Sequence, residues 1–201
     1  PYTTLFRSMG IYVFATELLF KIMERPGDDF GKHIIPSMLE THKVMGFVYD
    51  GYWADIGTIR RFYEVNLEMA SNQRPYDLYS PKRPIYTRPR FLPASEIHGA
   101  RMTRALVADG CRIADADITD AVIGQRSIVD AGVTIRSSVV MGADFYETEA
   151  EKAENLRMGR PDVGIGAGSM IEDAIVDKNA RIGKNVYIRR LADRPDADEG
   201  G

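Results

Sequence analysis

The chain has 201 residues, of which 44% are hydrophobic and 27% are charged, a composition typical of a globular protein rather than a disordered one. Its formal net charge of -3 leaves no basic excess for a polyphosphate backbone, and its single cysteine, Cys111, excludes an internal disulfide and a cysteine-based metal cluster. No apolar run reaches the roughly 18 residues of a membrane span, and the start lacks the pattern of a secretory leader. We therefore expect a cytoplasmic protein that binds neither nucleic acid nor membrane.

Residues 8–73 combine two kinds of apolar pattern. Short continuous apolar runs predict buried strands, and apolar residues three or four apart predict helices, so the alternation is typical of an α/β domain. Thr58 is the predicted N-cap of the last helix, because a threonine hydroxyl there accepts a hydrogen bond from a free amide of the first turn. In chain order, the predicted elements are a strand at residues 9–14, a helix at 17–23, a loop and short helix at 28–36, a strand at 44–49 and a helix that follows Thr58.

A connector at residues 74–96 separates this region from the rest of the chain. Proline has a fixed φ and no N–H group, so a proline-rich segment disfavours both helices and central strands. We therefore predict a domain boundary here. The prolines are Pro75, Pro81, Pro84, Pro89 and Pro93.

Residues 97–192 repeat an aliphatic residue about every six positions. This period predicts a parallel β-helix, in which each rung forms one face of a triangular coil and its aliphatic side chain stacks on the next rung. An antiparallel sandwich of short strands is the alternative. Residues 143–163 interrupt the repeat as a charged, solvated excursion from the coil, and residues 193–201 form a polar tail. The repeated residues are Ile123, Val129, Ile135, Met141, Ile165, Ile171, Val176, Ile182 and Ile188, preceded less regularly by Val107, Ile113 and Ile118.

Six segments carry a resemblance to a known enzyme family. In their order they resemble glucose-1-phosphate adenylyltransferase, also called ADP-glucose pyrophosphorylase, and the later ones are most similar to its cyanobacterial and plant branch. The resemblance implies an incomplete, Rossmann-like α/β nucleotidyltransferase domain followed by a left-handed parallel β-helix of hexapeptide repeats. The segments are residues 8–14 (SMGIYVF), 29–36 (DFGKHIIP), 51–58 (GYWADIGT), 84–93 (PIYTRPRFLP), 141–148 (MGADFYET) and 175–183 (IVDKNARIG).

The resemblance also implies an activity. Members transfer an adenylyl group from ATP to glucose 1-phosphate, release pyrophosphate and require Mg²⁺ to organise the phosphates, toward glycogen or starch. It further implies a homo- or heterotetramer.

Several family features are absent from this sequence. The glycine-rich phosphate-binding loop, the arginine that follows it and the catalytic metal aspartate do not occur, so we expect the isolated chain to be inactive. A sheet without its first strands exposes apolar edges, so we also expect residues 8–73 to fold poorly. Residues 1–7 match no family segment and are predicted to be non-native.

Three residues of the first region inherit site roles from the resemblance. Ser8 matches a serine that contacts glucose 1-phosphate; the alternative is a serine bonded to local backbone. Asp55 matches a metal ligand, and a hard Mg²⁺ ion prefers carboxylate oxygen, whereas the alternative is an N-cap for the next helix. Trp53 matches a position near the sugar site or acts in regulation, and its alternative is a core residue.

Three cations inherit a regulatory role. In this branch a phosphate-bearing activator, typically 3-phosphoglycerate, competes with inorganic phosphate for an anion site. Arg90 and Lys178 match residues that line this site, and Arg88 adds positive charge where the family often has glutamine. Arginine offers forked donors to phosphate and lysine a point charge. The alternative for each is a solvated surface cation.

The residues of this sequence are also compatible with three other functions. They are another sugar-1-phosphate nucleotidyltransferase, such as one that makes GDP-mannose or UDP-N-acetylglucosamine, a non-catalytic regulatory subunit of the same family, and a hexapeptide-repeat acyltransferase. Such acyltransferases usually place a histidine at a coil interface, and His33, His42 and His98 all lie outside the regular rungs.

Overall fold

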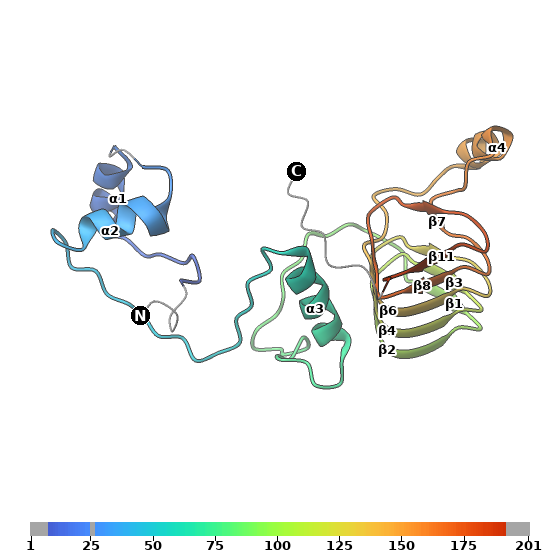
Figure 1. Cartoon of the computed structure of the whole chain (residues 1–201), viewed down its shortest axis with the longest axis horizontal. Coiled ribbons are helices and arrows are strands. Elements are labelled where there is room, and N and C mark those ends of the chain that lie inside the picture. Colours follow the sequence, from blue (N-terminus) through green and yellow to red (C-terminus); the bar gives the residue numbers. More distant parts are fainter. Residues whose placement is uncertain (1–7, 25–26, 192–201) are drawn as a thin grey trace. The chain divides into compact units, whose positions relative to one another are not determined.

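The computed structural model describes residues 8–24 and 27–191. It divides the chain into two compact units, Pro1–Asp55 and Ile56–Gly201 (Figure 1). The predicted non-native stretch at residues 1–7 and the polar tail at 193–201 lie outside the described residues. Among the described helices, none has the length and hydropathy needed to cross a membrane.

The described part of the first unit is built from α1 (Thr16–Met23), η1 (Phe30–Ile34) and α2 (Ile35–Met38). The helices predicted at residues 17–23 and within 28–36 are therefore confirmed. Asp29 begins η1, because its side chain accepts a hydrogen bond of 2.9 Å from the Lys32 amide. The helices share a small core of Ile22, Ile34 and Met38, against which Phe14, Leu18, Leu19 and Phe30 pack.

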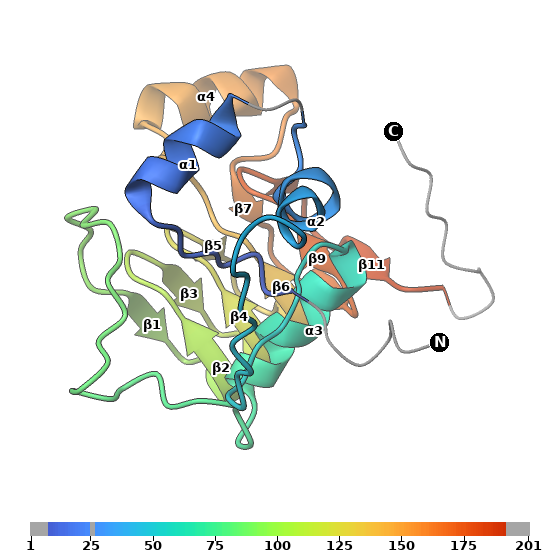
Figure 2. The ribbon, with the colours of Figure 1, turned by 90° about the vertical axis from the view of Figure 1, so that its left-hand side faces the viewer.

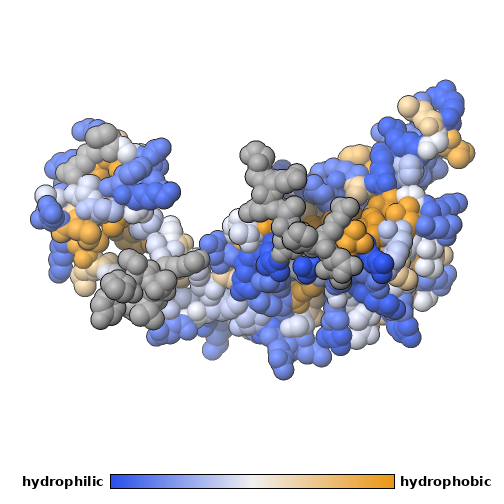
Figure 3. Space-filling view, in the orientation of Figure 1, coloured by the Kyte–Doolittle hydropathy of each residue, from blue (hydrophilic) through white to orange (hydrophobic). Residues whose placement is uncertain are grey.

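The strands predicted at residues 9–14 and 44–49 are wrong. Neither segment forms a ladder, because no neighbouring strand among the described residues of this unit supplies hydrogen-bond partners. Most of their apolar side chains stay exposed: Val13 is 96% and Phe47 is 88% exposed. Hydrophobic surface is visible in Figure 3 as orange atoms on the first unit.

Helix α3 (Ile59–Ala70) opens the second unit. Thr58 is its N-cap as predicted, since its Oγ1 accepts a 3.1 Å hydrogen bond from the Arg61 amide. The helix lies beside the strands that follow in the chain (Figures 1 and 2), and the Tyr63 hydroxyl donates a 2.5 Å hydrogen bond to the Ser137 carbonyl. Although predicted as part of the region 8–73, α3 therefore packs with the residues after the connector, whose residues 74–95 form neither helix nor strand.

The rest of the second unit is a parallel β-helix. All strand pairs are parallel, in the orders β1-β3-β5-β7-β10 and β11-β8-β6-β4-β2, with β9 on β6. This pairing confirms the β-helix and excludes the antiparallel sandwich. The strands are β1 (Glu96–His98), β2 (Arg101–Val107), β3 (Arg112–Ala114), β4 (Asp117–Ile123), β5 (Ile128–Val129), β6 (Thr134–Val140), β7 (Gly164–Ile165), β8 (Met170–Glu172), β9 (Ile175–Val176), β10 (Arg181–Ile182) and β11 (Tyr187–Arg189).

Strands β2, β4 and β6 each cover two faces of the coil. Each is interrupted by one residue with positive φ, Arg104, Asp120 or Ser137, and the pairing skips that residue. A single left-handed residue turns the chain sharply, so the strand continues on the next face. The β1-β3-β5-β7-β10 ladder forms the third face of the triangular coil.

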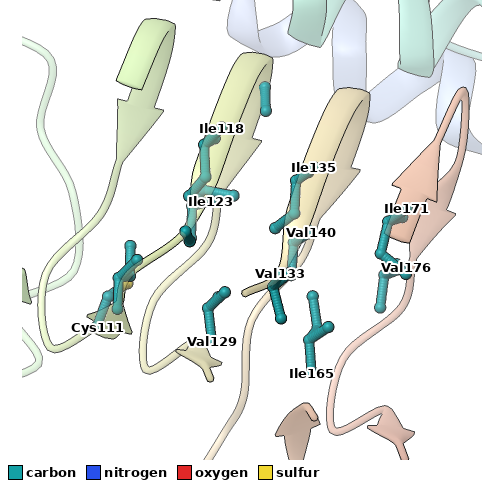
Figure 4. Close-up of a cluster of buried hydrophobic side chains, with 13 residues drawn as sticks. Cys111, Ile118, Ile123, Val129, Val133, Ile135, Val140, Ile165, Ile171 and Val176 are labelled. Carbon is teal, nitrogen blue, oxygen red and sulfur yellow. The ribbon is translucent and has the colours of Figure 1, made fainter. Parts of the chain in front are cut away.

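Aliphatic side chains fill the interior in stacked columns (Figure 4). In one column Ile135 lies between Ile118 and Ile171 in the strand register, and all three side chains are fully buried. Burying an aliphatic side chain of this size contributes roughly 1.5–3 kcal/mol. The columns therefore account for much of the stability of the β-helix.

The position predicted for Met141 in this interior is wrong. Val140 takes it instead, paired with Ile123 on one side and Val176 on the other, and Met141 begins the following turn. The reason is that neighbouring faces are separated by five residues across the left-handed corner, as between Ile135 and Val140, and not always by six.

The excursion at residues 143–163 carries helix α4 (Glu149–Met158), which leaves the coil as predicted (Figure 1). Thr148 and Glu151 form a reciprocal capping box at its start, and Gly159 ends it in the left-handed conformation. One charged residue departs from the predicted solvated face. The Glu147 side chain is only 3% exposed and accepts hydrogen bonds from the Val163 amide and from Asn155.

Candidate functional site

The candidate site lies at one corner of the β-helix, which we call the arm corner because the excursion with α4 begins there. It consists of residues 108–110, 124–126, 141–144 and 177–179. Their turns stack through backbone hydrogen bonds: the Arg126 amide donates to Asp109, the Ala143 amide to Gln125 and the Asn179 amide to Gly142, at 3.2, 2.8 and 3.0 Å. Successive coils are thus in direct contact at this corner.

Left-handed backbone conformations make this close stacking possible. Gly142 has a φ of +86°, and a Cβ atom there would lie 2.2 Å from the Gln125 carbonyl oxygen, so only glycine fits. Arg126 and Asn179 also have positive φ. Asparagine tolerates this conformation best among residues with side chains. The turns therefore hold the flanking side chains in fixed positions.

A carboxylate and an ammonium group meet at the arm corner. Lys178 Nζ donates to Asp144 Oδ1 at 2.7 Å, and Asn179 Nδ2 donates to Asp144 Oδ2 at 2.9 Å. The Asp144 amide in turn donates to Asn179 Oδ1 at 2.8 Å. The hydrogen bonds from Lys178 and Asn179, together with the charges of Lys178 and Arg126, lower the pKa of Asp144.

Arg126 is a second cation at this corner. Its guanidinium lies over the Tyr146 ring, 5.8 Å from the ring centre, and its Nη1 donates to the Ala143 carbonyl at 3.3 Å. The Tyr146 hydroxyl donates to the Gly110 carbonyl at 2.8 Å. The sequence prediction missed Arg126; the signal was its place in the turn after Ile123, which is equivalent to the turn after Val176 that carries Lys178.

The end of the proline-rich connector is attached to the same corner. The Ser95 hydroxyl donates to the Ala108 carbonyl at 2.6 Å and accepts from the Cys111 amide at 3.1 Å. Leu92 lies over Gly110, since a Cβ atom on that glycine would be 3.4 Å from the Leu92 Cβ. Arg90 precedes this anchored stretch by two residues.

The predicted anion-binding residues are therefore brought together only in part. Arg88 and Arg90 are both exposed, and Arg90 Nη1 lies 3.5 Å from the Arg88 carbonyl oxygen. Lys178 is at the arm corner and paired with Asp144. Within residues 8–24 and 27–191, no hydrogen bond or ion pair joins either arginine to Lys178.

The three residues predicted for substrate and metal belong to the first unit. Ser8 Oγ accepts a 3.1 Å hydrogen bond from the Gly10 amide and lies 3.2 Å from the Tyr12 hydroxyl, so its hydroxyl is bonded locally in this structure. Trp53 is 40% exposed and is not a core residue. Asp55 is exposed, and it is not the N-cap of α3, because Thr58 is.

Comparisons with known proteins agree with this two-part organisation. A family model described as the GLGC left-handed parallel β-helix domain matches residues 90–200, and one described as nucleotidyl transferase matches residues 2–72. The chain is 40% identical over 194 residues to glucose-1-phosphate adenylyltransferase large subunit 1, chloroplastic/amyloplastic, of Zea mays. The chain belongs to the glucose-1-phosphate adenylyltransferase (ADP-glucose pyrophosphorylase) family.

This alignment covers 95% of the chain but 38% of the relative, so the chain spans about two fifths of the length of the adenylyltransferase it matches. As in the sequence prediction, a nucleotidyltransferase portion is followed by a left-handed β-helix. Helix α3 lies within the nucleotidyltransferase match yet belongs to the compact unit of the β-helix. The family boundary and the structural boundary therefore differ by one helix.

Proposed function

We propose that this chain is the carboxyl-terminal part of a subunit that makes ADP-glucose for glycogen or starch synthesis. In this reaction an oxygen of glucose 1-phosphate attacks the α-phosphorus of ATP, and pyrophosphate leaves. The observation that carries the proposal is the 40% identity, along 95% of the chain, to a glucose-1-phosphate adenylyltransferase.

Three residues of the nucleotidyltransferase portion would serve the reaction. Ser8 would bind the sugar phosphate through its hydroxyl, and Trp53 would contact the sugar. Asp55 would give one carboxylate oxygen to Mg²⁺, which commonly takes one or two carboxylates and completes its shell with waters and substrate phosphates. This limited role fits the described residues, which contain no group of three side chains able to hold a metal by themselves. Bound Mg²⁺ would neutralise phosphate charge.

The 201-residue chain by itself is proposed to be inactive. Phosphoryl and nucleotidyl transfer depend on groups that position the phosphates of the nucleotide. The family's glycine-rich loop and the arginine that follows it are not in this sequence. Activity is therefore expected only when the chain is joined to that portion of the enzyme.

Control by anions is proposed for the arm corner. Lys178, Arg90 and Arg88 would bind inorganic phosphate or a phosphate-bearing activator such as 3-phosphoglycerate. Support comes from the connector, which Ser95 and Leu92 attach to the turn at residues 108–110. This turn stacks on the turn that carries Arg126, which is followed in the stack by the turn at residues 141–144 and then by the turn that carries Lys178. A partly exposed ammonium at a rigid corner suits an exchangeable anion.

The runner-up is a regulatory subunit that does not itself catalyse. The observation that favours this alternative is the name of the relative, which is a large subunit. By analogy we propose that this chain's parent subunit forms a homo- or heterotetramer.

The test is an assay of pyrophosphate release with ATP, glucose 1-phosphate and Mg²⁺. It compares the 201-residue chain with the complete reading frame that contains it, with and without 3-phosphoglycerate. Release by the complete subunit alone, raised by 3-phosphoglycerate, is the expected result. A complete subunit that is inactive alone but alters the effector response of a catalytic partner would establish the regulatory role. Release that requires another sugar phosphate or nucleotide would contradict the proposal.

A further inference from the structure

We infer that Asp144 is a built-in competitor for the anion site of the arm corner and that Arg126 is a further cation of that site. Without a ligand, the Asp144 carboxylate takes the place that a phosphate group of the ligand would take. The inference rests on the proposed anion site and adds to it a residue that opposes binding and a residue that supports it.

The contacts of Asp144 resemble those of a bound anion. Its two carboxylate oxygens each accept one hydrogen bond, from Lys178 Nζ at 2.7 Å and from Asn179 Nδ2 at 2.9 Å. Arg126 adds a second positive charge close enough to lower the pKa of this carboxyl group. An ammonium and an amide contact this one anion, and the Arg126 guanidinium donates to the Ala143 carbonyl directly before it. Together they form a donor set suited to phosphate.

The Lys178–Asp144 pair is poised for exchange. The side chains are 47% and 54% exposed, so a solute reaches the pair from solvent. Ion pairs this exposed contribute little net stability. Inorganic phosphate carries more charge than a carboxylate and offers more acceptor oxygens, so it is able to displace Asp144 from Lys178.

Displacement of Asp144 would act on the base of the excursion. Two residues later, Tyr146 is bonded to Gly110 and lies under the Arg126 guanidinium. The next residue, Glu147, is buried and lies 2.5 Å from Arg181 of β10. The segment 144–147 is therefore held at both ends. Release of its first residue changes the restraint on the start of the α4 excursion.

The first experiment is isothermal titration of the 201-residue chain with inorganic phosphate. Asp144→Asn keeps an oxygen that accepts from Asn179 but removes the charge that holds Lys178, so phosphate is expected to bind about two- to fivefold more tightly. Asp130→Asn removes the same charge from an exposed residue on another face, and is expected to leave binding unchanged. Arg126→Gln is expected to weaken binding by a factor of about five.

Hydrogen exchange gives an independent measurement on the same proteins. In the wild type, saturating phosphate is expected to accelerate exchange of the Asp144 amide, because its hydrogen bond to Asn179 Oδ1 depends on the position of the Asp144 side chain. The same amide in Asp144→Asn is expected to respond less. Circular dichroism establishes that each variant is folded.

The variants separate a failure of the anion site from a failure of the competitor role of Asp144. If Lys178→Gln binds phosphate as well as the wild type, the anion site itself is wrong. If Lys178→Gln weakens binding but Asp144→Asn does not tighten it, the anion site stands and the competitor role of Asp144 is overturned. Unchanged binding by Arg126→Gln would remove Arg126 from the site.

Discussion

The two units of the chain use similar apolar sequences with opposite results. In the β-helix, Arg112 pairs with Glu96 and with Ile128, each sixteen residues away, so a strand finds its partner one coil along the same chain. Among the described residues of the first unit, the apolar segments at residues 9–14 and 44–49 have no such neighbour. A strand-forming sequence becomes a strand only where another strand satisfies its backbone. The β-helix contains such partners within its own chain, and the described residues of the first unit do not.

The largest expected difference concerns buried and exposed isoleucines. Ile135→Ala should lower the free energy of unfolding of the β-helix by about 2–5 kcal/mol, because Ile135 is fully buried between two other isoleucines. Ile11→Ala is the matched change in the first unit, where Ile11 is 74% exposed, and should change stability by no more than about 0.5 kcal/mol. Urea unfolding followed by circular dichroism measures both. Equal losses would mean that the first unit buries its apolar run.

A pair of glycines sharpens the same comparison. Gly142→Ala should cost about 2–4 kcal/mol, from strain at positive φ and from contact with the Gln125 carbonyl. Gly10 also has positive φ, but a Cβ atom there would meet nothing within 4 Å. Gly10→Ala should therefore cost only about 1 kcal/mol of backbone strain. Thermal unfolding of both variants is the measurement, and a harmless Gly142→Ala would contradict the close stacking of the coils.

The buried carboxylate at the base of the excursion gives a smaller, pH-dependent effect. Burial raises the pKa of Glu147, but bonds from the Val163 amide, Asn155 and Arg181 outweigh it, so the pKa is lowered from its ordinary value of 4.5. Glu147 therefore stabilises the fold above pH 4.5, and this contribution is lost as pH falls through the lowered pKa. Glu147→Gln should cost about 2 kcal/mol at pH 7.

Unfolding by urea at a series of pH values tests this prediction. The loss of stability on acidification should be shallower in Glu147→Gln than in the wild type. Glu149→Gln is the control, because Glu149 lies on the same excursion with its side chain 90% exposed and is paired only at the surface with Lys152. If the two variants behave alike at pH 7, Glu147 does not anchor the excursion.

The smallest expected effect decides to which unit α3 belongs. Thr58→Ala removes the cap of α3 and should cost about 1 kcal/mol, whereas Thr58→Ser retains the hydroxyl and should cost less. Because Tyr63 bonds to Ser137, the loss should appear in the unfolding of the β-helix. Amide hydrogen exchange in β4 and β6 reports it. A loss confined to residues 8–55 would place α3 with the first unit.

Features that depend on neighbours in sequence were predicted correctly, and features that depend on the geometry of the folded coil were missed. The cap at Thr58 and the helix at residues 17–23 depend on neighbours in sequence, and both were predicted. The six-residue period identified the β-helix, because outside the excursion its strands pair with residues 16 or 17 positions away, as in Glu96 with Arg112 and Asp117 with Thr134. The inward position of Val140 was missed, since a left-handed residue at Ser137 shortens the spacing by one.

The candidate site divides in the same way. Lys178 was predicted from a sequence segment, and the structure places it at the arm corner. Arg126 and Asp144 were missed, because each belongs to a different turn. Only the stacking of coils brings Asp144 onto Lys178 and the turn of Arg126 onto the turn of Asp144. Glu147 was predicted to be solvated, because no local sequence pattern indicates its contacts with Arg181 and Asn155.

By itself, the sequence determined the period of the coil, the N-cap of α3 at Thr58 and the family resemblance, because these depend on residues close together in the chain or on segments in a fixed order. Only the tertiary structure decided which apolar runs become strands, that α3 packs on the β-helix, and that Asp144 pairs with Lys178 at the arm corner. Each of these outcomes depends on a partner from a distant part of the chain, whose arrival is set by the folded coil and not by local preference.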